Sequence, residues 1–187
     1  MKATWVSTPH PHVLLEDVFD PEEVPQVMKE LHRMDKVLLP PQLTGTATKE
    51  GIPLKNNEAT GLANLNWRSS LYRLCGNHLF DELIEQIPSL WFASSLSVCN
   101  KHSYLVSRYK SGQYYNSHFD RSFFTTLIWM YDEPKPFTGG DLIFTDYSEV
   151  LECKSNTGVV FLGPIKHEVP PIEGEGRYTI TRFSFNQ

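Results

Sequence analysis

Residues 108–120 read Arg-Tyr-Lys-Ser-Gly-Gln-Tyr-Tyr-Asn-Ser-His-Phe-Asp and place His118 two positions before Asp120. In an extended strand, residues i and i+2 point to the same face, so this spacing aims one nitrogen and one oxygen ligand at a single point. We therefore expect the motif to lie on a strand. Phe119, between the two ligands, is expected to face the other way into apolar packing.

Two imidazoles and one carboxylate form the facial ligand set of a non-haem Fe(II) ion, so a third ligand must come from elsewhere in the chain. His167 is the best candidate, because it follows the apolar run 158–162 and opens another strand-like segment, 167–169. A histidine considered alone is more often a packing or surface residue than a ligand. The sequence assigns five histidines to that class: His10, His12, His32, His78 and His102.

Arg177 lies in the segment 176–185, whose side chains alternate between two faces of a predicted strand. On the face of Arg177 the pattern places hydroxyl and aromatic side chains, so its guanidinium is expected to be buried. A buried charge is costly unless it is paired, and a guanidinium pairs best with a carboxylate in a bidentate fork. Two explanations follow: a structural salt bridge with one of the 22 acidic side chains, or an anchor for a dicarboxylate co-substrate.

Five sequence elements occur in order between Tyr104 and Phe185. They are Tyr109-x-x-Gly112-x-x-Tyr115-x-x-His118-x-Asp120, Gly139-Gly140-Asp141, Gly158 before an apolar strand, His167 and Arg177. As a set they resemble the catalytic core of the Fe(II)/2-oxoglutarate-dependent dioxygenases, and most of all the prolyl 4-hydroxylase-like branch. The resemblance implies a double-stranded β-helix (jelly-roll) core flanked by N-terminal helices, an α+β protein that is mainly β.

The resemblance also implies roles for individual residues. His118, Asp120 and His167 are expected to bind Fe(II), and Arg177 the distal carboxylate of 2-oxoglutarate. The family tyrosine that hydrogen-bonds 2-oxoglutarate falls on Tyr109. Further expected site residues, each with packing or a solvated loop as the alternative, are Thr179 and Leu127 beside 2-oxoglutarate and Arg121, Trp129 and Tyr115 on the substrate side.

The implied reaction is hydroxylation of a C–H bond, with a prolyl residue in a protein or peptide as the favoured substrate. Fe(II), 2-oxoglutarate and O2 take part, succinate and CO2 are released, and ascorbate is expected to support turnover. Two alternatives stay open: a hydroxylase of a free amino acid or other small molecule, and a non-catalytic jelly-roll binding module. Nucleic acid is not an expected partner, because the net charge is -5.

Three details narrow the chemistry further. Collagen-type prolyl hydroxylases usually carry lysine at the position of Arg177, so a collagen-like substrate is not favoured. Asp120 keeps the carboxylate that related halogenases replace by a small residue, which argues against halogenation. Gly-Gly-Asp stands at 139–141 where the family often has Gly-Gly-Glu, a difference that we expect to be structurally neutral.

Length and composition place the chain among single-domain globular proteins, because 187 residues with 40% apolar content can bury a core. Within it we expect a helical support and substrate-loop region at 1–95 and the catalytic jelly-roll at 96–187. Cys75, Cys99 and Cys153 are widely spaced, which indicates free thiols in a reducing compartment. With no apolar run long enough for a membrane helix and no secretory h-region after Met1, we predict a cytoplasmic protein that contacts no membrane. The oligomeric state does not follow from the sequence.

The N-terminal half is predicted to hold a strand at 13–19, a helix that begins with Asp20 as N-cap and Pro21 at the first position, and a second helix at 76–87. Between them the segment 40–66 has no periodicity, so we interpret it as a loop that closes over substrate or as a plain connection. Strands are predicted near 96–99, 103–109, 113–119, 123–131, 141–145, 149–153, 158–162, 166–170 and 177–185.

Overall fold

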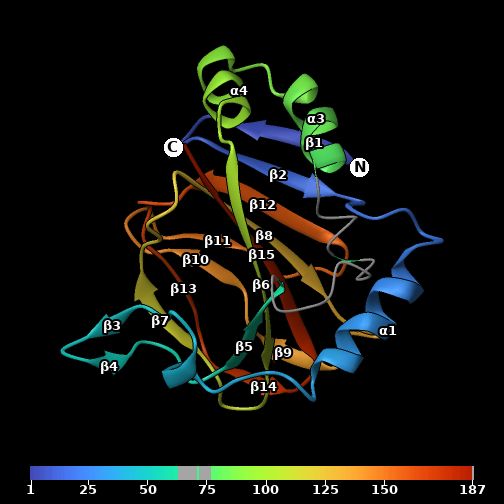
Figure 1. Cartoon of the computed structure of the whole chain (residues 1–187), viewed down its shortest axis with the longest axis vertical. Helices are drawn as coiled ribbons and strands as arrows, with labels where there is room; N and C mark the ends of the chain where they lie inside the picture. Colours follow the sequence, from blue (N-terminus) through green and yellow to red (C-terminus); the bar gives the residue numbers. More distant parts are fainter. Residues whose placement is uncertain (63–70, 72–76, 187) are drawn as a thin grey trace.

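The computed structural model describes residues 1–62, 71 and 77–186, and it confirms the mainly β, jelly-roll fold class (Figure 1). The strands are β1 (Lys2–Val6), β2 (His12–Glu16), β3 (Thr48–Lys49), β4 (Ile52–Pro53), β5 (Glu58–Gly61), β6 (Lys101–Tyr109), β7 (Tyr115–His118), β8 (Phe124–Met130), β9 (Phe137–Gly139), β10 (Leu142–Phe144), β11 (Glu149–Leu151), β12 (Thr157–Leu162), β13 (His167–Val169), β14 (Ile172–Gly174) and β15 (Arg177–Phe185). The helices are α1 (Val24–Met34), the 3-10 helix η1 (Pro41–Leu43), α3 (Asn77–Gln86) and α4 (Leu90–Ser97).

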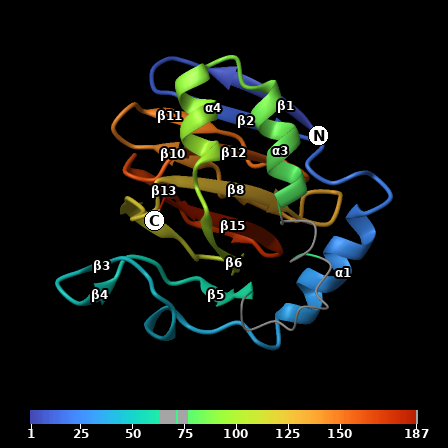
Figure 2. The same cartoon turned by 45° about the horizontal axis from the view of Figure 1, so that its top comes forward.

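Two antiparallel sheets form the body of the protein. The larger has seven strands in the order β1-β2-β12-β8-β15-β6-β5, and the smaller has four in the order β11-β10-β13-β7. Two short pairs, β14-β9 and β3-β4, complete the described strands. In Figure 2 the helices α3 and α4 lie across the outer face of the large sheet, and α1 lies beside it. The layers are therefore helices, large sheet and small sheet.

The large sheet separates two hydrophobic cores because side chains alternate along each strand. In β8, Phe124, Ile128 and Met130 face the helices, whereas Leu127 and Trp129 face the small sheet. Every residue of β8 is buried, and β12 and β15 pair with its two edges. The strand predicted near 123–131 is thus a central strand covered on both faces.

The structure corrects the predicted start of the first helix. The chain makes a turn over 20–23, where the Glu23 carboxylate accepts a hydrogen bond from the Asp20 backbone N–H at 3.2 Å, and α1 begins only at Val24. Asp20 therefore does not act as the N-cap, and Pro25 rather than Pro21 occupies the first turn, where a missing N–H has no cost.

A second correction concerns residues 96–99, which were predicted as a strand. Leu96 belongs to α4 and is buried with Phe92 and Ala93, at the i+3 and i+4 spacing of a helix. The Leu-Ser-Val-Cys run alternates as a strand would, but the contacts of the preceding turn determine the structure. The sequence also missed β1, β9 and β14.

The predicted loop 40–66 is more regular than its composition suggests over residues 40–62, whereas 63–66 lie outside the described residues. Residues 48–53 form the β3–β4 hairpin, which projects from the body in Figures 1 and 2, and β5 joins the edge of the large sheet beside β6. Leu39 also exchanges backbone hydrogen bonds with Ala59. The prediction of a segment without regular structure was therefore wrong for 48–61. These residues pair with neighbouring strands, and their sequence has no periodicity that would indicate strands.

Strands from both halves of the chain share one sheet, since β2 pairs with β12, β5 pairs with β6, and β1 extends the sheet beyond β2. The predicted division into a supporting region at 1–95 and a catalytic region at 96–187 therefore does not separate two structural layers. It stays a prediction about function. Among the described helices, none combines the length and apolar character that crossing a membrane requires.

Gly158 lies where β12 approaches β8 closely. A Cβ at this position would contact the Leu127 carbonyl oxygen and lie 3.2 Å from the Ile128 Cα, both backbone atoms that cannot move alone. We expect Gly158→Ala to lower the free energy of unfolding by about 1–3 kcal/mol and the Tm by roughly 3–10 °C. Gly45→Ala is the matched control, because an added Cβ there meets no atom within 4 Å. Equal melting temperatures of the two variants in calorimetry would contradict the close approach.

Candidate active site

Two predicted ligands face each other across neighbouring strands of the small sheet. His118 ends β7, His167 begins β13, and the two residues are register partners in the antiparallel pairing. Their ring centroids lie 4.3 Å apart, and both side chains are buried. Directly opposite side chains in such a pair are held close together, so the pairing itself aims both imidazoles into the space between the sheets.

Asp120 completes the cluster from just beyond the end of β7. Its backbone N–H donates to the Gly163 carbonyl oxygen at 2.8 Å, which turns the chain away from the strand. Its carboxylate oxygens lie 4.0 Å from Nε2 of His118 and 3.6 Å from Nε2 of His167. One donor atom from each residue lies within 4.8 Å of the others, a spacing at which all three could hold one metal ion.

The turn after β7 also explains a wrong prediction. Phe119 is 57% exposed rather than packed in a core. The strand β7 ends at His118, so Phe119 lies beyond the strand. Its side chain faces solvent there.

Outer hydrogen bonds orient each ligand. Nδ1 of His118 contacts the Asn116 carbonyl oxygen at 2.8 Å, and Nδ1 of His167 contacts the Ile165 carbonyl oxygen at 2.9 Å. A carbonyl accepts from an N–H, so both Nδ1 atoms carry the proton and both Nε2 lone pairs point into the cluster. This tautomer is the one that metal-binding histidines adopt.

Thr125 is a positioning residue that the sequence analysis missed. Its hydroxyl donates to Asp120 Oδ2 at 2.6 Å, and it lies 2.8 Å from the Ser122 hydroxyl. A strand threonine gives no separate signal in the sequence. Only the chain turn after Asp120 brings it under the carboxylate.

The electrostatics of the cluster suit a cation. Burial, and secondarily His167, lowers the pKa of His118 to about 3, which keeps this imidazole neutral. Burial raises the pKa of Asp120, although His167 and the Thr125 hydroxyl act in the opposite direction. A mostly buried carboxylate beside the neutral His118 imidazole would be balanced by a divalent ion.

Tyr115 and Lys55 form one wall of the cluster. The Tyr115 ring stacks on His118 with centroids 3.5 Å apart, and its hydroxyl accepts the Ala47 backbone N–H at 3.2 Å. Lys55, in the segment after the β3–β4 hairpin, lies with its Nζ 5.7 Å from the same ring. Burial lowers the pKa of this lysine to about 8. Lys55 was not predicted, because nothing in its segment marks it for burial.

Arg177, at the start of β15, is almost completely buried, with 1% of its surface exposed. Its Nε donates to the Gly140 carbonyl oxygen at 2.8 Å, one Nη donates to the Thr179 hydroxyl at 2.7 Å, and its Cζ lies 4.6 Å from the Tyr109 ring centroid. The other Nη is buried without a hydrogen bond. Within the described part of the chain no acidic side chain forms an ion pair with this guanidinium, which disfavours the structural salt bridge.

Gly140 makes room for the arginine. Its φ is +75°, and a Cβ there would lie 2.7 Å from Cγ2 of Ile172 and 2.9 Å from Cδ of Arg177. Both the backbone conformation and the contact therefore require glycine. Asp141 follows and accepts the Cys153 backbone N–H at 2.9 Å, which joins the two ends of the β10–β11 hairpin.

The remaining predicted residues divide into two groups. Leu127 and Trp129 lie in the core between the sheets, and Tyr109 is the register partner of Arg177, with burial raising its pKa to about 12. Trp129 is the register partner of Thr179, so it lies near the arginine end of the interior. Arg121 is exposed beyond the metal-ligand cluster.

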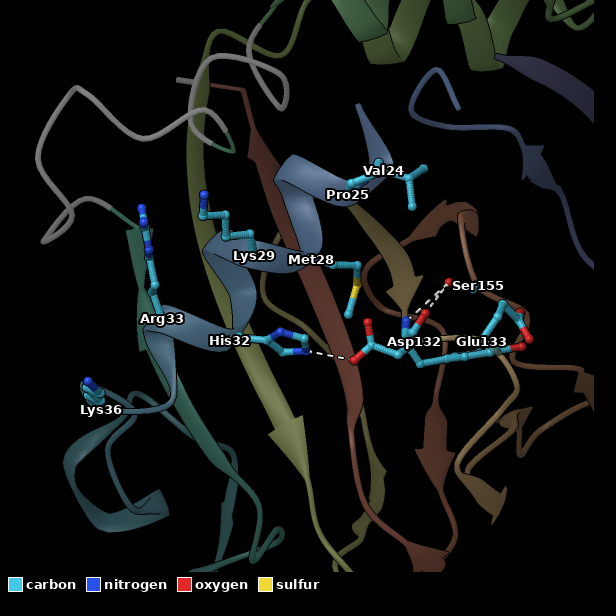
Figure 3. A pocket seen from close by; sticks show the side chains of 11 residues that line it. Val24, Pro25, Met28, Lys29, His32, Arg33, Lys36, Asp132, Glu133 and Ser155 are labelled. Atoms are coloured by element: carbon cyan, nitrogen blue, oxygen red, sulfur yellow. Dashed lines mark hydrogen bonds and ion pairs between the residues drawn. The ribbon is translucent and has the colours of Figure 1, made fainter. Parts of the chain in front are cut away.

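An open groove of about 730 Å³ lies elsewhere, between α1 and residues 131–133 (Figure 3). Its lining includes the half-exposed pair His32 and Asp132, 2.8 Å apart. Both members of that pair face solvent, and neither contacts the His118 cluster. The candidate metal-ligand cluster therefore lies apart from this groove, in the space between the sheets.

Comparisons with known proteins agree with this geometry. Residues 104–185 match the family model of the 2OG-Fe(II) oxygenase superfamily. The sequence has no match among curated proteins. Similar solved structures include a Pseudomonas putida prolyl-4-hydroxylase, with a TM-score of 0.63 at 19% identity over 96% of this chain and 94% of that one.

Two further structures share the fold. One is a Trichoplax adhaerens prolyl hydroxylase in complex with a peptide fragment of the hypoxia inducible factor oxygen degradation domain, with a TM-score of 0.68, 14% identity, and coverage of 94% of this chain and 83% of that one. The other is a Burkholderia pseudomallei oxidoreductase of the 2OG-Fe(II) oxygenase family, with a TM-score of 0.68, 14% identity, and coverage of 94% and 86%. The resemblance predicted from the sequence is confirmed: residues 104–185 match the 2OG-Fe(II) oxygenase superfamily model, and the prolyl hydroxylase structures share the fold of this chain.

Proposed function

We propose that this enzyme hydroxylates a prolyl residue in a protein or peptide, consuming 2-oxoglutarate and O2 and releasing succinate and CO2. One observation carries the proposal: a buried His118, Asp120 and His167 cluster shares its interior with a buried arginine that has an unpaired Nη. A metal site and a free guanidinium are the two anchors that 2-oxoglutarate requires. Tyr109 lies against Arg177 and Tyr115 stacks on His118, and both tyrosines belong to the same hydrophobic core.

In this proposal the chain's own residues bind and orient. His118, Asp120 and His167 hold Fe(II), which supplies the oxidising chemistry when bound. Arg177 holds the distal carboxylate of 2-oxoglutarate through the Nη that has no protein partner, and Thr179 and Gly140 fix the guanidinium plane. The buried side chains of the inner core exclude water around both anchors.

The substrate side is proposed to lie at the mouth beside β7. The Tyr115 ring, which covers His118, is contacted from both sides of the β3–β4 hairpin. Ala47 before the hairpin donates its backbone N–H to the Tyr115 hydroxyl, and Lys55 after it forms a backbone bridge with Tyr115. A hairpin that projects over the site edge offers an extended peptide more surface than a sealed small-molecule pocket would. The peptide complex of the Trichoplax adhaerens structure supports the same substrate class. Arg121 and Trp129 stay predictions as substrate contacts.

Free thiols support the predicted cytoplasmic location. Cys99 and Cys153 are both unpaired and buried, whereas Cys75 lies outside the described residues. Unpaired cysteines are typical of a reducing compartment, where iron also stays ferrous. Ascorbate is proposed as a supporting reductant in assays.

The central test measures succinate release from 2-oxoglutarate with Fe(II) and ascorbate. We expect His118→Ala to lose Fe(II) binding and Arg177→Ala to keep it, while each reduces kcat/KM for 2-oxoglutarate by at least about 100-fold. His32→Ala is the matched control, because His32 is a half-exposed histidine outside the site. If the wild-type protein neither binds Fe(II) nor consumes 2-oxoglutarate, the binding-module alternative replaces the enzyme.

A second test concerns the space that glycine leaves for Arg177. We expect Gly140→Ala to displace the guanidinium and to raise the KM for 2-oxoglutarate by about 10- to 100-fold, because small misplacements of an anchor are costly. Fe(II) affinity should stay within about threefold, since Gly140 touches no metal ligand. Gly45→Ala serves as the control, and an unchanged KM in Gly140→Ala would refute the anchor role.

Substrate class is tested by adding prolyl peptides, free proline and other free amino acids to the same assay. We expect peptides to stimulate succinate release by more than about tenfold over the uncoupled rate, with a mass gain of one oxygen atom on a prolyl residue. Stimulation by a free amino acid alone would favour the small-molecule alternative and leave the oxygenase assignment intact.

A further inference from the structure

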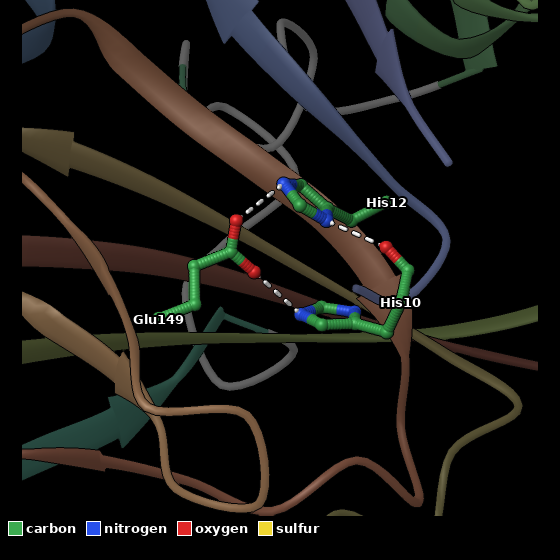
Figure 4. Close-up of side chains that lie close together, drawn as sticks. All are labelled: His10, His12 and Glu149. Carbon is green, nitrogen blue, oxygen red and sulfur yellow. Dashed lines mark hydrogen bonds and ion pairs between the residues drawn. The ribbon is translucent and has the colours of Figure 1, made fainter. Parts of the chain in front are cut away.

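A second group of two histidines and one carboxylate lies at the opposite side of the aromatic core. His12 is the first residue of β2, His10 lies two positions before it, and Glu149 is the first residue of β11 (Figure 4). Nε2 of His10 lies 3.0 Å from Oε2 of Glu149, and Nε2 of His12 lies 3.8 Å from Oε1. One donor atom from each residue lies within 4.8 Å of the others, as in the His118 cluster.

Burial makes this arrangement unusual for plain packing. His10 and His12 are 1% and 0% exposed, and the Glu149 side chain is 21% exposed. Nε2 of each histidine and Oε2 of Glu149 are buried without a hydrogen bond in the described part of the chain. The short distance between His10 and Glu149 therefore lacks hydrogen-bond geometry. Unpaired buried polar atoms are destabilising, and a cation shared by all three would satisfy them together.

The neighbours of the cluster orient its rings. Nδ1 of His12 donates to the His10 carbonyl oxygen at 3.1 Å, so the Nε2 lone pair of His12 points toward Glu149. The His10 ring stacks on Tyr147 at 4.5 Å and meets the edge of Phe144 at 4.2 Å. His12, with one ring nitrogen held by a backbone carbonyl, therefore presents the other toward a metal, whereas the His10 ring is held by its aromatic neighbours.

We propose that His10, His12 and Glu149 bind a divalent transition-metal ion, with zinc as the best-suited ion, at a site separate from the catalytic one. Two imidazole nitrogens and one carboxylate oxygen match the ligands that zinc accepts, and water would complete the shell. The partly exposed Glu149 provides the route of entry. Glu149 faces both rings, through Oε2 toward His10 and Oε1 toward His12, so the three side chains already converge on one point.

The site would act as a clip between the two sheets. His12 belongs to β2 of the large sheet, whereas Glu149 belongs to β11 at the edge of the small one. Between this cluster and His167 lie Phe144 and Phe161, with ring centroids 5.0 Å apart. An ion bound by folded protein alone stabilises it by linkage, so the clip should raise the melting temperature.

The test separates the two sites by disabling the first. In metal-free His118→Ala protein we expect Zn²⁺, added with a competing chromophoric chelator, to bind at one equivalent and to raise the Tm by several degrees. Glu149→Gln in the same background keeps the side-chain volume and should lower Zn²⁺ affinity by at least about tenfold and abolish the Tm rise. His118→Ala/His32→Ala is the matched control, which removes a histidine outside both clusters and should behave as the parent.

Two outcomes would overturn the proposal: no Zn²⁺ equivalent bound by the folded His118→Ala protein, or an equivalent that Glu149→Gln leaves unchanged. Circular dichroism of the metal-free variants establishes that each is folded. His12→Gln provides a second ligand variant, and unchanged Zn²⁺ affinity there would also refute the site. Because the readouts are metal stoichiometry and stability, the result does not depend on oxygenase activity.

Discussion

The antiparallel pairing of β7 with β13 is the contact on which the candidate site depends. It sets His118 directly opposite His167. The backbone pairing therefore holds two candidate ligands from distant parts of the chain close together. Each imidazole is then fixed by a backbone carbonyl two residues before it in the sequence. The backbone therefore supplies position and tautomer together, and the turn after β7 brings Asp120 to Thr125. A shift in this pairing would move both ligands at once.

A second constraint is the burial of Arg177, which the fold tolerates at a cost. Three partners surround the guanidinium, yet one Nη remains unpaired. Removing a charge from water without a full counter-charge is unfavourable, and the glycine at 140 adds backbone entropy to that cost. Structures retain such groups where a ligand supplies the missing partner. Arg177 and the metal-ligand cluster thus share one feature: each has a charged or polar atom without a full partner in the described part of the chain. This shared feature is the physical argument for a co-substrate held at both points.

The sequence predicted the parts of the site that local spacing encodes. The His118 and Asp120 motif, the strand that holds Arg177 and the glycines before Asp141 all follow from short-range patterns, and the core strand β8 follows from its apolar run. Residues placed by chain crossings were missed. Lys55 comes from an aperiodic segment and reaches Tyr115 only through strand pairing, and Thr125 depends on the turn after β7. Phe119 was assigned to a core because the motif was treated as a continuous strand, whereas hydrogen bonding to Gly163 ends the strand at His118.

His10 and His12 show where such reasoning stops and why. Their i, i+2 spacing at the start of a strand is the same local signal that drew attention to His118 and Asp120, yet it lacked the downstream partners that made the first motif specific. The missing partner is Glu149, which the jelly-roll brings beside β2 by folding the small sheet over the large one. Both three-residue clusters lie between the sheets and touch the aromatic layer of Phe144 and Phe161. Close-packed rings transmit displacement, so the position of the N-terminal strand and that of His167 are mechanically linked through two side chains. The N-terminal segment therefore packs against the strands that hold the candidate site, although it lies far in the sequence from His118 and Asp120.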